Sequence, residues 1–201
     1  DFVEQYDGKG STSADFLTLK GNVGWGRNKT DSALWPTRGY IMKANAEIGL
    51  PGGDIQYYKL THGQTWFFPL SKNLTLMLNG EVGYAKGLSG KEMPFYKNFY
   101  AGGGSSVRGY EAASLGPYEI VAGSNDEMRL GGTRRFVFNA ELMMPMPGLE
   151  KSVRFGPFFD AGQVWADKAD IAKNCVPGVI CDQGPIRMSE IGRASCRERV
   201  S

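Results

Sequence analysis

Apolar and polar residues alternate along most of the chain. In six stretches every second residue is apolar and the residues between are mostly polar or glycine. These stretches are 17–25, 40–50, 55–70, 74–84, 136–144 and 153–165. A period of two predicts β-strands with one apolar face. In 55–70 the two faces are poorly separated, so the sequence predicts a strand there without fixing its orientation. Residues 186–189 look like the start of one more strand.

The lengths of these strands favour a membrane barrel over a soluble sandwich. Sandwich strands are commonly about five or six residues long, whereas strands of about ten residues with no helix between them are typical of antiparallel transmembrane β-barrels. Several connections are short turns and one, about 85–132, is very long, as in barrels with short turns on one side of the membrane. The fold class predicted is all-β, an antiparallel barrel segment. The aromatic residues expected to form interface girdles near the strand ends are Trp25, Tyr40, Tyr84, Phe136, Phe138 and Trp165.

Composition is compatible with this fold. No apolar run approaches the roughly 18 residues of a membrane helix, and a mean hydropathy of −0.32 suits strands with one polar face. The formal net charge of +2 does not indicate a nucleic-acid partner. The chain opens at Asp1 without a signal peptide, so a mature form or an internal fragment is expected, and a fragment is favoured.

The long connection contains three consecutive glycines, Gly102, Gly103 and Gly104, followed by Arg108. Glycine permits positive φ and close backbone approach, so this segment can turn tightly and direct one cation into a narrow space. A phosphate loop would need a further glycine or a Lys-Ser/Thr pair before a helix. Val107 stands where that glycine would be, which excludes nucleotide binding by such a loop.

Two carboxylates are placed to meet this arginine. Strand parity puts Glu141 and Asp160 on the polar, inward face of two strands joined by one hairpin. A bidentate contact between Arg108 and a carboxylate is geometrically favoured and would anchor the loop inside the barrel. The alternative is that both acids face lumen water and that Arg108 is a solvated loop residue.

The remaining reactive residues do not indicate an enzyme or a metal site. His62 is the only histidine and has no neighbouring Ser/Asp group of a recognisable triad. One histidine and three scattered cysteines lack zinc-ligand spacing. Cys175 and Cys181 flank a turn-like segment, where a small disulfide is plausible in an oxidising compartment. No cofactor is expected.

The glycine loop and several other motifs resemble the BamA family of outer-membrane protein assembly factors, most of all the members from Neisseria-like bacteria. The signature is Val107-Arg108-Gly109-Tyr110, preceded by Asn98-Phe99-Tyr100 and the glycines. Further matches are 35–39, 64–70, 90–95, Ala140-Glu141-Leu142 and 158–162. In this family the loop enters the lumen of a barrel of about sixteen strands, and its arginine contacts acids on the two following strands. The resemblance runs from about Phe16 to Ser189 and covers about six of the strands.

The resemblance implies a barrel fragment that serves to fold and insert β-barrel proteins into the bacterial outer membrane. The implied partners are unfolded outer-membrane proteins, the lipoproteins of the BAM complex and the lipid bilayer, with no nucleic acid. Two alternatives stay open: a two-partner secretion transporter of the same superfamily, and a passive porin-like channel. Residues 1–189 are expected to form the partial barrel, and residues 190–201, which lack alternation and contain Cys196, a non-native tail.

Overall fold

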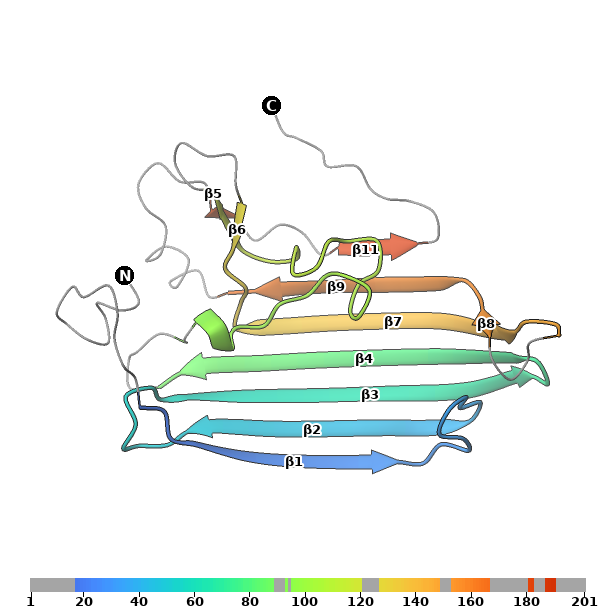
Figure 1. Cartoon of the computed structure of the whole chain (residues 1–201), viewed down its shortest axis with the longest axis horizontal. Coiled ribbons are helices and arrows are strands. Elements are labelled where there is room, and N and C mark those ends of the chain that lie inside the picture. The colour runs from blue at the N-terminus through green and yellow to red at the C-terminus, as the bar shows by residue number, and fades with distance from the viewer. Residues whose placement is uncertain are drawn as a thin grey trace.

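The computed structural model describes residues 17–88, 93, 95–120, 127–148, 153–166, 181–182 and 187–190. Its main element is an antiparallel sheet with the strand order β1-β2-β3-β4-β7-β9-β11, in which β8 pairs with β7 (Figure 1). Neighbours in the sheet therefore follow the order of the chain, as expected for a barrel wall. The predicted fold class is confirmed. Among the described residues, no helix is long and apolar enough to cross a membrane.

The strands of the main sheet lie close to the predicted stretches. Their bounds are β1 Lys20–Asn28, β2 Gly39–Gly49, β3 Tyr57–Ser71, β4 Leu74–Gly87, β7 Arg134–Pro145, β8 Arg154–Phe155, β9 Phe158–Trp165 and β11 Arg187–Glu190. The β4–β7 connection holds the short 3₁₀ turn η1 Phe95–Lys97, and its strands β5 Tyr118–Ile120 and β6 Glu127–Arg129 form a small second sheet with β10 Cys181–Asp182. Within the part of the chain that the structure describes, each long strand of the main sheet is paired on both sides except β1, which lies at the edge.

One predicted strand is wrong in its continuity. The stretch 153–165 is divided into β8 and β9 by Gly156 and Pro157. The backbone at Gly156 lies so close to the carbonyl of Leu142 that a side chain has no room there. The carbonyl of Pro157 accepts a hydrogen bond from the Leu142 amide at 3.0 Å. Proline has no amide hydrogen for the ladder, so regular pairing stops at this point and resumes at Phe158.

The outer face of the sheet is apolar and carries aromatic rings at two heights. At one end Trp66 packs against Tyr40 and Phe68, with ring centroids 4.9 and 6.2 Å apart. At the other end Tyr58 and Tyr84 are 5.8 Å apart. Along β3, Tyr58 lies eight residues from Trp66 and ten from Phe68, or roughly 21 to 26 Å of membrane depth for a strand tilted by ~40°. This separation matches the apolar band of an outer-membrane barrel, about 25 Å tall.

The predicted girdle position of Phe138 is wrong. Phe138 pairs with Gly80 and Phe136 with Val82, near the middle of β4. The strand β7 begins before both phenylalanines and β4 runs on to Gly87. Phe138 therefore belongs to the middle of the apolar band, whereas Phe136, the third residue of β7, lies close to the level of Tyr84.

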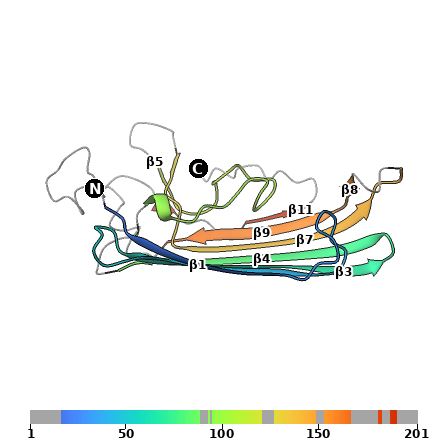
Figure 2. The ribbon, with the colours of Figure 1, turned by 60° about the horizontal axis from the view of Figure 1, so that its bottom comes forward.

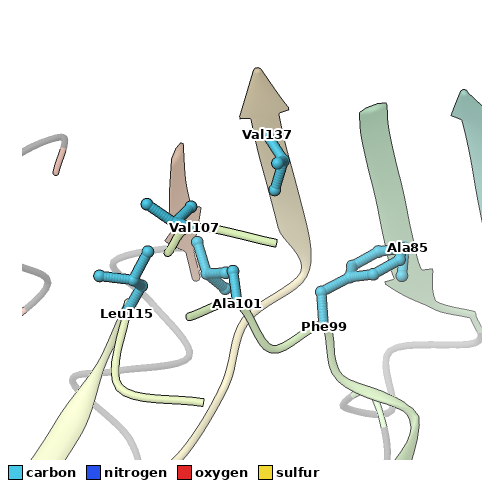
Figure 3. Packing of buried hydrophobic residues seen from close by; sticks show 7 residues of the cluster. Ala85, Phe99, Ala101, Val107, Leu115 and Val137 are labelled. Atoms are coloured by element: carbon cyan, nitrogen blue, oxygen red, sulfur yellow. The ribbon is translucent and has the colours of Figure 1, made fainter. Parts of the chain in front are cut away.

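The β4–β7 connection folds back over the other face of the sheet. Figure 2 shows the sheet edge-on, curving toward the side on which this connection lies. Buried apolar side chains join the connection to the wall, as Figure 3 shows for Val107, Leu115 and Val137. The complete cluster is Ala85, Phe99, Ala101, Val107, Leu115, Val137 and Val164. We call the described residues of this connection, 93, 95–120 and 127–133, the inward loop.

Candidate functional site

The structure brings Arg108, Glu141 and Asp160 together on the inner face of the wall. The arginine Nε donates to Asp160 Oδ2 at 2.7 Å and its Nη2 donates to Asp160 Oδ1 at 2.8 Å, which is a bidentate contact. Its Nη1 donates to Glu141 Oε2 at 2.7 Å. The Asp160 side chain is 0% exposed, against 30% for Arg108 and 26% for Glu141. The aspartate contact is therefore the fully buried part of this group.

The register of β7 and β9 puts the two acids on the same face. Glu141 pairs with Phe158 and Asp160 pairs with Asn139, so both carboxylates project toward the inward loop. The backbone amide of Arg108 also donates to Asp160 Oδ2 at 3.0 Å, and the guanidinium carbon lies 3.8 Å from the centroid of the Phe158 ring. Hydrogen bonding to Asp160, and then to Glu141, raises the pKa of Arg108 above its ordinary value despite partial burial. Arg108 is therefore a fixed cation.

The glycines of the loop have distinct roles. Gly102, Gly103 and Gly109 have φ values of +111°, +87° and +84°, which favour glycine strongly. Gly104 has open space around it, so its lack of a side chain is not required by its surroundings. The hydroxyl of Ser106 accepts from the Gly102 amide at 2.8 Å and donates to the Gly102 carbonyl at 3.0 Å, which closes the turn.

The residues on either side of the Arg108–Gly109 pair fix the loop to the wall. Val107 is fully buried, and a Cβ on Gly162 of β9 would lie only 2.7 Å from its Cγ2 atom. Tyr110 packs against the buried apolar cluster, and its carbonyl accepts from the Gly103 amide at 3.0 Å. The valine therefore fits into the space that the missing side chain of Gly162 leaves.

A row of polar side chains, absent from the sequence prediction, links three strands to the loop. Thr65 Oγ1 donates to Asn79 Oδ1 at 2.8 Å, and Asn79 Nδ2 donates to Asn139 Oδ1 at 2.9 Å. Asn139 Nδ2 then donates to the carbonyl of Ser106 at 2.7 Å. These residues and Arg108 line a polar cavity of about 230 Å³. Inward parity was visible in the sequence, but the pairing of these positions required the strand register.

The other candidates lie apart from this site. His62 sits on the outer face of β3, paired with Ala44 and Val82. Cys181 is in β10, whereas Cys175 lies outside the described residues, and so does the disulfide predicted between them. Within the described ranges, no group of three or more His, Cys, Asp or Glu side chains could hold a metal. Of the predicted tail, only Glu190 is described, as the last residue of β11.

Comparisons with known proteins agree with this architecture. The model of the Omp85 superfamily domain matches residues 3–179. The outer membrane protein assembly factor BamA of Neisseria meningitidis serogroup B is 53% identical over 173 residues, which are 84% of this chain and 22% of that protein. BamA of Nitratidesulfovibrio vulgaris is 31% identical over 144 residues, 70% of this chain and 17% of that protein.

The likeness extends to a solved structure and to eukaryotic proteins. A crystal structure of BamA from Haemophilus ducreyi lacking POTRA domains 1-3 matches with a TM-score of 0.70 and 25% identity, covering 87% of this chain and 39% of that one. The Sorting and assembly machinery component 50 homolog of Mus musculus is 28% identical over 130 residues, 64% of this chain and 26% of that protein. The chain thus spans about a fifth of the length of the BamA relatives it matches.

The residues that carry the sequence resemblance also lie together in the structure. The residues that resemble the loop motif and the two strand motifs of the BamA family are the ones that meet around Arg108. The apolar outer face and these relatives assign the chain to the bacterial outer membrane, as a segment of a β-barrel wall. The chain belongs to the Omp85 superfamily.

Proposed function

We propose that this chain is part of the barrel of a protein that folds and inserts other β-barrel proteins into the outer membrane. The observation that carries the proposal is the inward loop fixed by Arg108 on a wall whose sequence is 53% identical to a BamA over 84% of the chain. Residues 1–189 would supply the middle and later part of a larger barrel wall. Residues 190–201 would be a non-native tail, of which Glu190 still pairs with Phe159 as the last residue of β11.

The residues of this chain would act as wall and lumen loop rather than as the insertion gate. Assembly would use β-augmentation, in which unpaired backbone groups of a sheet edge pair with an incoming strand. Lipid cannot satisfy the free edges of an open sheet, so the segment would need the rest of its barrel. The stability of the inserted product would drive the process without an enzymatic step or a cofactor. The partners would be unfolded outer-membrane proteins, the lipoproteins of the BAM complex and the bilayer.

Within this function Arg108 would be a structural anchor. Val107, Gly109 and Tyr110 would place it, and Glu141 and Asp160 would hold it, so that the loop occupies a fixed position in the lumen. Support comes from the bidentate contact to a fully buried carboxylate. A passive channel has no need of a glycine-rich loop fixed in this way.

The test is a chimeric barrel in which residues 17–165 of this chain replace the matching segment of the Neisseria meningitidis BamA. The chimera is inserted into liposomes together with its lipoproteins, and an unfolded outer-membrane protein is added. Folding of that substrate is followed by its heat-modifiable gel mobility. We expect folding at a rate close to that of the parent. A chimera that inserts but leaves the substrate unfolded would contradict the assembly function and favour the transporter, and one that cannot insert would contradict the proposed place in the wall.

A further inference from the structure

A second group of charged side chains holds the start of the inward loop. Lys97, the last residue of η1, donates from Nζ to Glu47 Oε1 at 2.8 Å, and the two side chains are only 20% and 16% exposed. The hydroxyl of Tyr57 donates to the same carboxylate oxygen. Burial works against the charge on Lys97, but the hydrogen bonds with Glu47 and Tyr57 outweigh it, so that the pKa of Lys97 is raised. The lysine is held as a cation in this position.

A further lysine fixes the backbone at the same point. Lys59 donates from Nζ to the carbonyl of Lys97 at 2.6 Å and lies 4.1 Å from the centroid of the Phe99 ring. Phe99 is 5% exposed and rests on the backbone of β4, where a Cβ on Gly83 would lie 2.6 Å from its ring. The wall therefore holds the side chain of Lys97, the carbonyl of Lys97 and the ring of Phe99.

The two charged groups contact different strands. Glu47 belongs to β2, Tyr57 and Lys59 to β3, and Gly83 to β4, whereas the acids that hold Arg108 belong to β7 and β9. These five strands are consecutive neighbours in the sheet. The side-chain contacts of a loop held at Lys97 and again at Arg108 therefore reach every one of these strands, from β2 to β9, on the inner face, while its backbone after η1 lies over β7 and β9 (Figure 1).

We infer that Lys97 is a second positioning residue and that the inward loop is a brace, fastened by Lys97 to β2 and β3 and by Arg108 to β7 and β9. The inference rests on the proposed function in one respect, namely that the loop lies inside a closed barrel. Burying charged side chains is costly unless they are paired and hydrogen-bonded. Here two lysines, one glutamate and one tyrosine are arranged so that the cations meet a carboxylate, a carbonyl and a ring. A brace predicts that release at one end loosens the loop at the other.

The experiment is hydrogen exchange on the inserted chimeric barrel, read by mass spectrometry on peptides from residues 100–115. Lys97→Met is compared with Lys97→Arg, which keeps the cation, and with Lys72→Met in the β3–β4 turn as the control. We expect Lys97→Met to speed exchange at least tenfold in 100–115, not only in 95–99, while Lys97→Arg restores most of the protection and Lys72→Met changes nothing. If Lys97→Met fails to insert, Glu47→Gln replaces it, with the same expected spread.

Two results would overturn the brace. One is faster exchange confined to residues 95–99, which would make the Lys97 contact a local one. The other is equal loosening by Lys97→Met and Lys97→Arg, which would show that the cation is not what matters. Substrate folding is measured on the same samples. Exchange that spreads through the loop supports the brace even if the chimera folds no substrate, so failure of the proposed function is distinguished from failure of this inference.

Discussion

Removing the guanidinium of Arg108 should release the inward loop from the wall. Arg108→Ala deletes three side-chain hydrogen bonds to two acids and leaves Asp160, which is 0% exposed, without its counter-charge. Removing one partner of a buried ion pair costs about 3–5 kcal/mol. Since about 1.4 kcal/mol corresponds to a factor of ten, the open state of the loop should become roughly a hundred to a few thousand times more populated.

Limited proteolysis of the chimeric barrel measures this change. Cleavage of a loop follows the population of its open state when opening and closing are fast relative to cleavage. The rate of cutting within 100–120 should therefore rise by the same factor. Glu111→Ala is the matched control because Glu111 is an exposed acid of the same loop, and its removal leaves the anchor untouched. Glu141→Gln should have a smaller effect than Arg108→Ala, since that partly exposed side chain accepts a single bond from the arginine.

An unchanged cleavage rate in Arg108→Ala would refute the anchor. The apolar cluster around Val107 would then be sufficient to hold the loop. If Arg108→Ala does not insert, Arg108→Lys provides the same comparison, because lysine keeps the charge but cannot form the two parallel bonds to one carboxylate. Cutting in Arg108→Lys at the rate of the parent would then count against the importance of the bidentate geometry.

Three further predictions concern the wall and one turn. Gly83→Ala should destabilise the barrel by about 1–3 kcal/mol, because the new Cβ would lie 2.6 Å from the Phe99 ring. Gly80→Ala, which places its Cβ in open space, should leave the stability unchanged. Stability is measured as the midpoint temperature at which the barrel loses its heat-modifiable gel mobility, and equal midpoints for the two variants would contradict the packing. Asn139→Ala should raise loop cleavage about tenfold, since a donor to the loop backbone is lost; parental cleavage would exclude that role. Hydrogen bonds from the Thr37 hydroxyl and amide lower the pKa of Asp31 to about 2. Above pH ~4 this exposed carboxylate should therefore stabilise its turn by less than ~1 kcal/mol, and the stabilisation should be lost as the pH falls toward 2. The measurement is the pH dependence of the NMR chemical shifts of the backbone amides of residues 31–38, which Asp31→Asn should abolish. A pH dependence that Asp31→Asn leaves unchanged would assign the transition to another group.

The position of the two acids could be predicted from the sequence because it depends only on local parity. Alternation with a period of two puts Glu141 and Asp160 on the polar face of their own strands, whatever the neighbouring strands do. The hydrogen bond between Asn79 and Asn139 is different, since the two residues are 60 positions apart. It requires the register of β4 against β7, which the long inward loop between them leaves undetermined.

The misplaced ring of Phe138 and the missed Lys97–Glu47 pair have related physical causes, whereas the break between β8 and β9 comes from Gly156 and Pro157. The height of a residue in the wall depends on where its strand begins relative to its neighbours, and alternation does not carry that information. Phe138 was therefore expected at a strand end, although it lies opposite Gly80 in mid-sheet. The pair of Lys97 with Glu47 was missed for a related reason, because η1 has no periodic pattern and its partner lies 50 residues earlier.

The loop needs charged anchors because apolar contact alone does not fix its position. Val107 and Leu115 pack in one apolar cluster with Val137 and Val164, and apolar burial is non-directional, so the cluster favours contact with the wall without setting the orientation of the loop. Bidentate and paired hydrogen bonds fix both distance and orientation. The carboxylate of Asp160 sets where the loop lies along the wall, and the apolar cluster then excludes water from the contact. A loop with the patch but without the charges would remain attached to the wall in several registers.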